Sequence, residues 1–379
     1  MPGPLSHIKV LDLSRILAGP WSTQMLGDLG AEIIKIERPG SGDDTRSWGP
    51  PFVKNPDGSK GDAAYYLSAN RNKTARFIDI STEAGQAEIK HLVKQCDIVV
   101  ENYKVGGLKK YGLDYQSLSA INPSLIYCSI TGFGQTGPYV KRTGYDFMIQ
   151  AMGGMMSITG EKECDGGTPQ KVGVAIADIM TGMYATIGIL AALSHREKTG
   201  EGQYIDLALL DCQIAMLANH TSNYLVSGDV PQRLGNAHVS IVPYQTFKTR
   251  DGDIVIAVGN DTQFQSFALA LGKTKLATDK RFATNEARVN HRDVLVPLIA
   301  TKIQKKTTND WLKILTQYQV PCGPVNSIDK VLADPQVIHR KMVREIQSED
   351  GMMIPTVANP INFSKTPIEY RKAPTKIKN

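Results

Sequence analysis

Short apolar runs alternate with helical patterns at the start of the chain, and this alternation most constrains the fold. Residues 8–13 predict a strand, residues 15–20 a turn and residues 21–29 a helix that Gly30 ends, after which residues 31–37 predict a second strand. Strands that alternate with helices usually form a parallel sheet covered on both faces. The sequence therefore predicts an α/β fold with a Rossmann-like, doubly wound parallel sheet.

The same pattern continues to about residue 130. Further apolar strands are predicted at 75–80, 97–101 and 125–130, with a helix at 82–95. After about residue 225 the pattern of alternating strands and helices changes. The turn residues Arg250-Asp-Gly252 separate two strand-like runs, as in a hairpin. Helical patterns then follow near 262–271, 293–306 and 309–318.

These patterns predict two domains, which also agrees with a length of 379 residues. Residues 1–224 form the first part of a large Rossmann-like domain, and residues 225–330 form a smaller α+β domain. Residues 331–379 return to the large domain.

Composition narrows the class of protein and its partners. Hydrophobic residues at 41% and the absence of a long uncharged apolar run predict a globular chain without a membrane span. Five scattered cysteines without a CxxC pair predict a reducing compartment and no metal site. The net charge of +6 is mild, and a basic surface can serve nucleic acid or a polyanionic cofactor. Because the basic residues form no long run, we do not expect nucleic acid as the partner.

Asp178 is the strongest candidate for chemistry. It follows the apolar run Lys171-Val-Gly-Val-Ala-Ile-Ala, where a helical pattern begins that ends in basic residues and Gly200. We therefore predict that Asp178 is the N-cap of this helix, which is by itself an ordinary structural role. A helix N-terminus also keeps a carboxylate ionised, as a covalent nucleophile requires. The small residues Gly182, Ala185 and Gly188 predict a helix face that approaches other backbone closely.

A dinucleotide-binding dehydrogenase is one alternative for such a sheet. Its first strand–helix turn needs the repeated glycines of GxGxxG to admit a pyrophosphate. Here the turn reads Arg15-Ile-Leu-Ala-Gly-Pro20, which lacks them. The sequence predicts the scaffold without the dinucleotide.

Ordered motifs along the whole chain resemble the family III CoA-transferases. They include Leu29-Gly-Ala-Glu-Ile-Ile-Lys-Ile-Glu-Arg-Pro-Gly40, Val100-Glu-Asn-Tyr103, Gly132-Phe-Gly-Gln-Thr-Gly-Pro138, Gly144-Tyr-Asp146 and the Asp178 segment. The resemblance implies an enzyme that uses coenzyme A as a co-substrate, with no tightly bound cofactor. It also implies a covalent aspartyl intermediate at Asp178 and a homodimer of two interlocked chains.

The resemblance also implies roles for residues around the ligand. Arg38 would pack on the adenine, which suits a planar guanidinium, and cations would pair with the phosphates. The residues assigned to coenzyme A are Arg15, Ala18, Arg38, Arg71, Lys73, Asn102, Tyr103 and Lys110. The residues assigned to the acyl and acid substrates are Arg46, Tyr145, His238, Gly259 and Asn260, with Arg46 and His238 as cations for a far carboxylate.

A narrower resemblance, carried by Ala237-His-Val-Ser-Ile-Val-Pro-Tyr-Gln-Thr-Phe-Lys-Thr249, is to the mitochondrial branch that uses succinyl-CoA and glutarate. It implies a dicarboxylic acid acceptor and the mitochondrial matrix, with the cytoplasm as the other compartment. Transfer to formate, oxalate or carnitine stays open, as does a non-catalytic CoA-binding role. A 2-methylacyl-CoA racemase is less favoured, because Tyr145 stands where that branch has histidine, and a phenol with a pKa of about 10 is a poor base. The family's C-terminal helix has no counterpart before Asn379.

Overall fold

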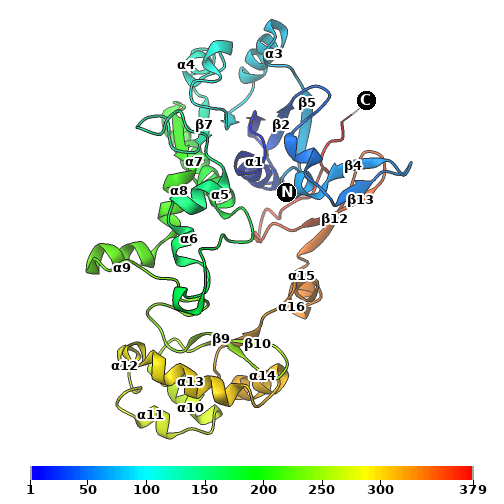
Figure 1. Ribbon diagram of the computed structural model, residues 1–379. Helices are drawn as coiled ribbons and strands as arrows, with labels where there is room; N and C mark the ends of the chain where they lie inside the picture. Colours follow the sequence, from blue (N-terminus) through cyan, green and yellow to red (C-terminus); the bar gives the residue numbers. More distant parts are fainter. Residues whose placement is uncertain (1, 378–379) are drawn as a thin grey trace. The chain divides into compact units, whose positions relative to one another are not determined.

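The computed structural model describes residues 2–377, and the chain divides into two compact units (Figure 1). The larger unit comprises Met1–Met155, Lys171–Asp229 and Pro335–Asn379, and the smaller comprises Met156–Gln170 and Val230–Asp334. These boundaries lie a few residues beyond those predicted at 224 and 330.

The segment Met156–Gln170 differs more clearly from the sequence-based division, which placed it in the large domain. It belongs to the smaller unit because it pairs with the chain after residue 230. The Gly235 amide donates to the Gly160 carbonyl at 3.1 Å, and the Arg233 guanidinium donates to the Glu161 carbonyl at 3.3 Å.

The larger unit is built on a six-stranded sheet whose neighbouring strands are all parallel. Its order is β5-β2-β1-β6-β7-β8, so the order reverses between the two central strands, β1 and β6. This is the doubly wound arrangement expected from the sequence, in which ligands bind beyond the carboxyl ends of the strands at the reversal. The strands are β1 (Lys9–Asp12), β2 (Glu32–Glu37), β5 (Lys73–Phe77), β6 (Ile98–Glu101), β7 (Ile126–Thr131) and β8 (Tyr204–Ala208).

Two apolar cores cover the two faces of this sheet, because successive strand residues point to opposite sides. On β1, Val10 belongs to one core and Leu11 to the other. Helices α1 (Ala18–Asp28) and α7 (Ile176–Thr199) cover the first face, while α3 (Glu83–Val93) and α4 (Tyr115–Ser119) cover the second (Figure 1).

Close packing against α1 fixes the direction of α7. A Cβ atom added at Gly182 would lie 2.6 Å from the Ala18 carbonyl oxygen, so only glycine fits there, as the small-residue pattern predicted. The Ser22 and Thr186 hydroxyls, one from each helix, are 3.1 Å apart. This packing brings the first turn of α7 to the carboxyl edge of the sheet.

By length and composition alone, α7 could also span a membrane, and 44% of its most apolar window is buried in the protein. The sequence did not predict a possible membrane span here, because Asp178 interrupts the apolar run. Core helices of globular proteins have the same composition, and α7 packs as one.

The remaining elements of the larger unit lie at its edges. Two hairpins are β3 (Phe52–Lys54) with β4 (Lys60–Ala63), and β12 (Val343–Gln347) with β13 (Met353–Val357). The shorter helices are η1 (Asp44–Ser47), α2 (Ala64–Ser68), η2 (Lys109–Tyr111), α5 (Asp146–Met152), α8 (Leu209–Met216), α9 (Asn219–Ser227) and α16 (Pro335–His339). Helix α6 (Met155–Ile158) begins at the boundary between the units.

The smaller unit has its own antiparallel sheet and core, as the hairpin signal around Gly252 predicted. The strands follow the order β11-β10-β9, and helices pack on them around the fully buried Trp311. Its elements are η3 (Glu163–Asp165), β9 (Tyr244–Lys248), β10 (Asp253–Ala257), α10 (Asp261–Ala270), α11 (Lys275–Thr278), α12 (Asn285–Asn290), α13 (Arg292–Ile303), α14 (Thr308–Gln317), β11 (Cys322–Pro324) and α15 (Ile328–Leu332).

Candidate active site

A cavity of about 1040 Å³ opens at the carboxyl edge of the six-stranded sheet, entirely within the larger unit. Its walls are the loops that follow β1, β2, β5, β6 and β7, together with Asp178 at the start of α7. The strand order reverses at this place, so the cavity occupies the position where doubly wound sheets bind ligands.

Asp178 occupies the third position of α7, and the N-cap is Ala175, whose side chain makes no capping bond. The prediction that Asp178 itself caps the helix is therefore wrong. Asp146 supplies the missing cap from α5, because its Oδ1 accepts from the Ala177 amide at 2.8 Å and from the Asp178 amide at 3.4 Å. The Asp178 carboxylate is thus not engaged in capping its own helix.

The environment of Asp178 makes its carboxyl group a weaker acid than usual. Burial and the negative charge of Asp146 raise the pKa of Asp178 to about 7. This outcome differs from the sequence-based expectation that the position at a helix N-terminus keeps Asp178 ionised. The loss of hydration and a like charge exceed the dipole contribution, which is typically below about 1 kcal/mol.

Two glycines hold Asp146 in this position. A Cβ atom at Gly144 would lie 2.4 Å from the Cα of Gly132, so the chain after β7 crosses the chain before α5 at backbone contact. The Asp146 carboxylate also accepts from the Gln150 amide at 2.8 Å. The motif Gly144-Tyr-Asp146 was recognised in the sequence, but no role was predicted for Asp146. Its position as an acid at the start of a helix is the signal that could have indicated one.

The cavity wall is rich in cations. It includes Arg15, Arg38, Lys104, Lys110, Lys141 and Arg142, of which all but Arg15 are exposed. Exposed Lys and Arg side chains around a cavity suit a ligand that carries several phosphates. The wall thus combines a carboxylate with a raised pKa and a field that favours polyanions.

A comparison with known protein families identifies the family of the chain. The sequence profile of CoA-transferase family III matches residues 5–376. The chain belongs to this family. The fold and the enzyme class predicted from the sequence motifs are thereby confirmed.

Individual relatives of this CoA-transferase agree with the family assignment. The chain is 51% identical over 374 residues to succinate–glutarate CoA-transferase of Agrobacterium fabrum, covering 99% of this chain and 93% of that one. It is 43% identical over 371 residues to human succinyl-CoA:glutarate CoA-transferase, covering 98% and 83% respectively. The crystal structure of a CAIB/BAIF family protein from Brucella suis superposes with a TM-score of 0.87 at 50% identity, covering 100% of this chain and 97% of that one.

Several residues assigned from the sequence do line the cavity of this CoA-transferase. They are Arg15, Ala18, Arg38, Asn102, Tyr103, Lys110, Tyr145 and Asp178. The Asn102 side chain joins the loops after β6 and β1, because it accepts from the Arg15 amide at 2.9 Å and donates to the Arg15 carbonyl at 2.7 Å. The Arg15 guanidinium also pairs with Asp44 at 2.9 Å, so part of its charge is used within the protein.

Arg46 does not line the cavity, contrary to its assignment as a carboxylate ligand. Its guanidinium is buried and binds both oxygens of Glu37, at 2.7 and 2.9 Å, as well as Asp62 at 2.8 Å. The Tyr66 hydroxyl and the Thr375 carbonyl accept from its Nη2 at 2.6 and 2.8 Å. These protein contacts satisfy the side chain without any substrate.

Arg71 and Lys73 also lie outside the cavity, contrary to their assignment to coenzyme A phosphates. The Arg71 guanidinium binds both carboxylate oxygens of Asp28, at 2.9 and 2.6 Å. The Lys73 ammonium is fully buried and contacts Asp12, Asn70 and the Pro20 carbonyl. A sequence shows that a side chain is basic but not whether it is buried beside an acid.

His238, Gly259 and Asn260 belong to the smaller unit. The Nδ1 atom of His238 accepts from the Ser240 amide at 3.0 Å, which assigns the proton of the neutral ring to Nε2. The Gly259 amide donates to the Gln263 side chain at 2.7 Å, while Asn260 caps α10 by accepting from the Gln263 amide at 2.9 Å. Their proposed substrate contacts stay a prediction from the sequence.

The first turn of α7 is a place where backbone amides could bind an oxyanion. Its free amides are already used, since Ile176 donates to the Val174 carbonyl, Ala177 and Asp178 donate to Asp146, and Ile179 donates to the Ala175 carbonyl. The first turn of α7 therefore presents the Asp178 side chain rather than amide donors.

Tyr65 is a neighbour that no sequence pattern indicated. Burial, followed by the negative charges of Asp178 and Asp146, raises the pKa of Tyr65 to about 12. Its phenol remains a neutral hydroxyl within electrostatic range of both acids. Among the described residues 2–377, no group of three or more His, Cys, Asp or Glu side chains is arranged to hold a metal ion.

Proposed function

We propose that this CoA-transferase moves CoA from succinyl-CoA to a dicarboxylic acid such as glutarate, through covalent intermediates at Asp178. The observation that carries the proposal is a single one: Asp178 lies in the wall of a cation-lined cavity, with its carboxylate free of helix capping. The named activities of the relatives that are 51% and 43% identical support this donor and this acceptor.

The covalent route divides one difficult transfer into four easier acyl transfers. The Asp178 carboxylate attacks the carbonyl carbon of succinyl-CoA, and a mixed anhydride forms as the CoA thiolate leaves. The thiolate then attacks the aspartyl carbonyl, which releases succinate and leaves an aspartyl-CoA thioester.

The second half repeats these steps with the acceptor. A glutarate carboxylate attacks the aspartyl thioester, giving a new mixed anhydride and the CoA thiolate. The thiolate attacks the glutaryl carbonyl, which forms glutaryl-CoA and restores the Asp178 carboxylate. In each cycle, one oxygen atom therefore passes from Asp178 to succinate, and another passes from glutarate to Asp178.

The cavity supports this chemistry through its charges. Arg38, Lys104 and Lys110 line the wall and suit the phosphates of coenzyme A. With a pKa of about 7, about half of the Asp178 carboxyl groups are ionised at neutral pH, and this carboxylate is more basic than that of an ordinary aspartate and hence more nucleophilic. With Arg46 buried against Glu37, His238 is the remaining sequence-based candidate for the far carboxylate of the acid.

An oxygen-labelling experiment tests the covalent route. With enzyme in excess over succinyl-CoA and with ¹⁸O-labelled glutarate, the first succinate released should be unlabelled, and the peptide containing Asp178 should gain ¹⁸O. Direct attack of glutarate on succinyl-CoA would instead label that first succinate and leave the peptide unlabelled, which would refute the covalent route.

The acid substrates need a separate test. The enzyme should be incubated with succinyl-CoA and a panel of acids, and the new CoA esters identified by mass spectrometry. We expect glutarate to be the preferred acceptor. A large preference for formate, oxalate or carnitine would replace glutarate without affecting the role of Asp178.

We also propose a homodimer, as the family resemblance implies. Its support here is the exposed apolar surface of the larger unit, which includes Ile187 on α7 and Leu225 and Val226 on α9, exposed by 59%, 75% and 89%. Exposed apolar groups of this size favour association. Light scattering should give twice the chain mass of 41.4 kDa, whereas an active monomer would refute the dimer. The mitochondrial compartment stays a prediction of the resemblance.

A further inference from the structure

The last described stretch of the chain, residues 369–376, lies along the edge strand β5, and we call it the C-terminal strap (Figure 1). The Thr375 hydroxyl bonds the Ala75 amide at 3.1 Å and the Lys73 carbonyl at 3.3 Å. The Asn72 side chain accepts from the Arg371 amide at 2.7 Å, and the Asn72 amide donates to the Lys372 carbonyl at 2.9 Å. The strap therefore supplies hydrogen-bond partners to part of the outer edge of β5 and to Asn72 just before it.

Two buried arginines tie the chain after residue 335 to the sheet, and their surroundings are closely matched. Arg71 binds both oxygens of buried Asp28 and donates to Thr356 Oγ1 and the Val357 carbonyl, at 3.1 and 3.0 Å. Arg46 binds both oxygens of buried Glu37 and donates to the Thr375 carbonyl in the strap. Each guanidinium thus bridges a buried carboxylate and a carbonyl from the end of the chain.

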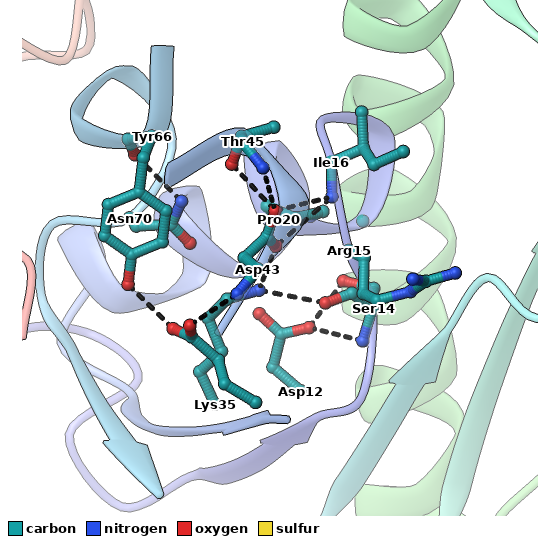
Figure 2. A network of polar contacts seen from close by, with 12 residues as sticks. Asp12, Ser14, Arg15, Ile16, Pro20, Lys35, Asp43, Thr45, Tyr66 and Asn70 are labelled. Carbon is teal, nitrogen blue, oxygen red and sulfur yellow. Dashed lines mark hydrogen bonds and ion pairs between the residues drawn. The ribbon is translucent and has the colours of Figure 1, made fainter. Parts of the chain in front are cut away.

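The two arginines differ in what lies behind the carboxylate. Glu37 Oε2, which Arg46 binds, also accepts from the Asp43 amide at 2.7 Å. Asp43 in turn accepts from the Ile16 amide at 3.2 Å, from the Thr45 hydroxyl at 2.7 Å and from the Lys35 ammonium at 3.0 Å (Figure 2). Glu37, Asp43 and Ile16 all line the cavity, whereas Asp28, Thr356 and Val357 do not.

Ile16 shows why this support matters. Its φ angle is 72°, a left-handed backbone conformation that is unfavourable for a β-branched side chain. Such a conformation persists only where the surrounding contacts hold it. Asn102 holds Arg15 in this loop and Asp43 holds the strained Ile16, while Glu37, which Arg46 binds, holds the Asp43 amide.

We propose that Arg46 is a positioning residue that makes the C-terminal strap a support of the coenzyme A site, an inference that rests on the proposed function of this cavity. The chain of contacts runs from Thr375 through Arg46, Glu37 and Asp43 to Ile16. Loosening it at Arg46 allows the loop at Ile16 to relax, so that coenzyme A binds a wall that is no longer preformed. Asp178 is not part of this chain, so the chemical steps keep their rate once the ligand is bound.

The matched arginines provide the experiment. Arg46→Lys and Arg71→Lys each keep the charge but lose the two-pronged contact with a buried carboxylate. We expect both variants to lose similar thermal stability. Arg46→Lys should weaken coenzyme A binding about tenfold in calorimetry and raise the KM for acyl-CoA equally, with kcat within about twofold. Arg71→Lys should stay within about twofold of wild type in both constants.

Calorimetry with coenzyme A does not depend on which acid is the acceptor, so failure of the glutarate assignment would leave this test intact. Hydrogen exchange gives a second measurement: the Ile16 and Asp43 amides should exchange faster in Arg46→Lys than in Arg71→Lys. If Arg46→Lys does not fold, Tyr66→Phe is a milder change, which removes the 2.8 Å bond to Glu37 and the 2.6 Å bond from Arg46, and it should show the same pattern at about threefold. Equal effects of the two arginine variants, or unchanged affinity in folded Arg46→Lys, would overturn the proposal.

Discussion

Two groups of acids at the carboxyl edge of the same sheet differ in how their charge is compensated. Asp12 and Asp43 lie beside Lys73 and Lys35, at 3.2 and 3.0 Å. Burial alone would raise the pKa of Asp12, but the two lysines and the hydroxyls of Ser14 and Thr23 outweigh it and hold that pKa below its ordinary value. Asp178 has only another acid, Asp146, among the charged groups that shift its pKa, and that pKa rises to about 7.

This difference in charge compensation distinguishes the acids that support the cavity loops from the acid that we propose as the nucleophile. A buried carboxylate with matched cations is stabilised as an anion and is therefore a weak nucleophile. A carboxylate that keeps its charge without a cation is more basic and can form a covalent bond to an acyl carbon. The compensated Asp43 holds a loop of the cavity, and the uncompensated Asp178 lines the cavity, where we propose that it reacts.

The largest expected effect is at Asp178. Asp178→Asn keeps the shape but removes the attacking oxygen anion, so kcat should fall by at least about 10³-fold, or roughly 4 kcal/mol of transition-state stabilisation. Coenzyme A affinity should remain within a few-fold of wild type, because the cations proposed to bind the phosphates, such as Arg38 and Lys110, are other residues of the cavity wall. Steady-state rates and calorimetry check both statements. Substantial turnover, in a sample whose substitution is verified by mass spectrometry after the assay, would remove the distinction between the two groups of acids.

For the acids that are paired with lysines, we expect substitution of the lysine to lower the free energy of unfolding by a comparable amount. Lys73→Met leaves Asp12 buried without its nearest cation, which typically costs about 3–5 kcal/mol. Urea unfolding measures this, and the exposed Lys94→Met is the matched control, for which we expect a change within about 0.5 kcal/mol. A stable Lys73→Met variant with impaired coenzyme A binding would restore the ligand role predicted from the sequence.

The sequence alone predicted much of this architecture, because strand and helix patterns depend on local hydrophobic spacing. The strands at β1, β2, β6 and β7 and the helix after Thr82 lie within a few residues of their predicted bounds. Asp178, which the sequence singled out at the start of a long helix within a family motif, lines the cavity, and its catalytic role stays a prediction. The missed hairpin β3–β4 carries a weaker apolar pattern, whereas strand β8 was missed although its sequence is mostly apolar.

The cations were harder to assign. Arg38 and Lys110 line the cavity as predicted, while Arg46, Arg71 and Lys73 are buried in ion pairs. Their partners Glu37, Asp28 and Asp12 are 9, 43 and 61 residues away in sequence. Such pairs depend on the tertiary fold, which brings together residues that no local pattern links. The cap that Asp146 provides to α7 was missed for the same reason, across 31 residues.

The acid pair makes a smaller, pH-dependent prediction. The nucleophile is the ionised form of Asp178, so kcat/KM should be full above the raised pKa of about 7 and fall as the pH drops through it. Asp146→Asn removes the like charge but keeps an oxygen that can accept from the Ala177 amide. The acidic limb of the profile should therefore move to lower pH by about one unit.

Asp211→Asn is a control for this shift, because Asp211 is an exposed acid on α8 and lies outside the cavity lining. Its profile should match that of wild type. An acidic limb that stays in place in Asp146→Asn would show that burial alone raises the pKa of Asp178.

The smallest expected effect is at an exposed cation of the cavity wall. The Lys110 ammonium lies 4.6 Å from the ring centroid of Tyr111 and is exposed, so water already stabilises its charge. Lys110→Ala should raise the KM for acyl-CoA only about two- to fivefold, and added salt should shrink the difference, since exposed charges are screened over about 8 Å at physiological ionic strength. Unfolding stability should not change, in contrast to Lys73→Met. A salt-independent loss of affinity in Lys110→Ala would mean that this lysine is buried by the bound ligand, and the division between exposed binding cations and buried supporting cations would then be too simple.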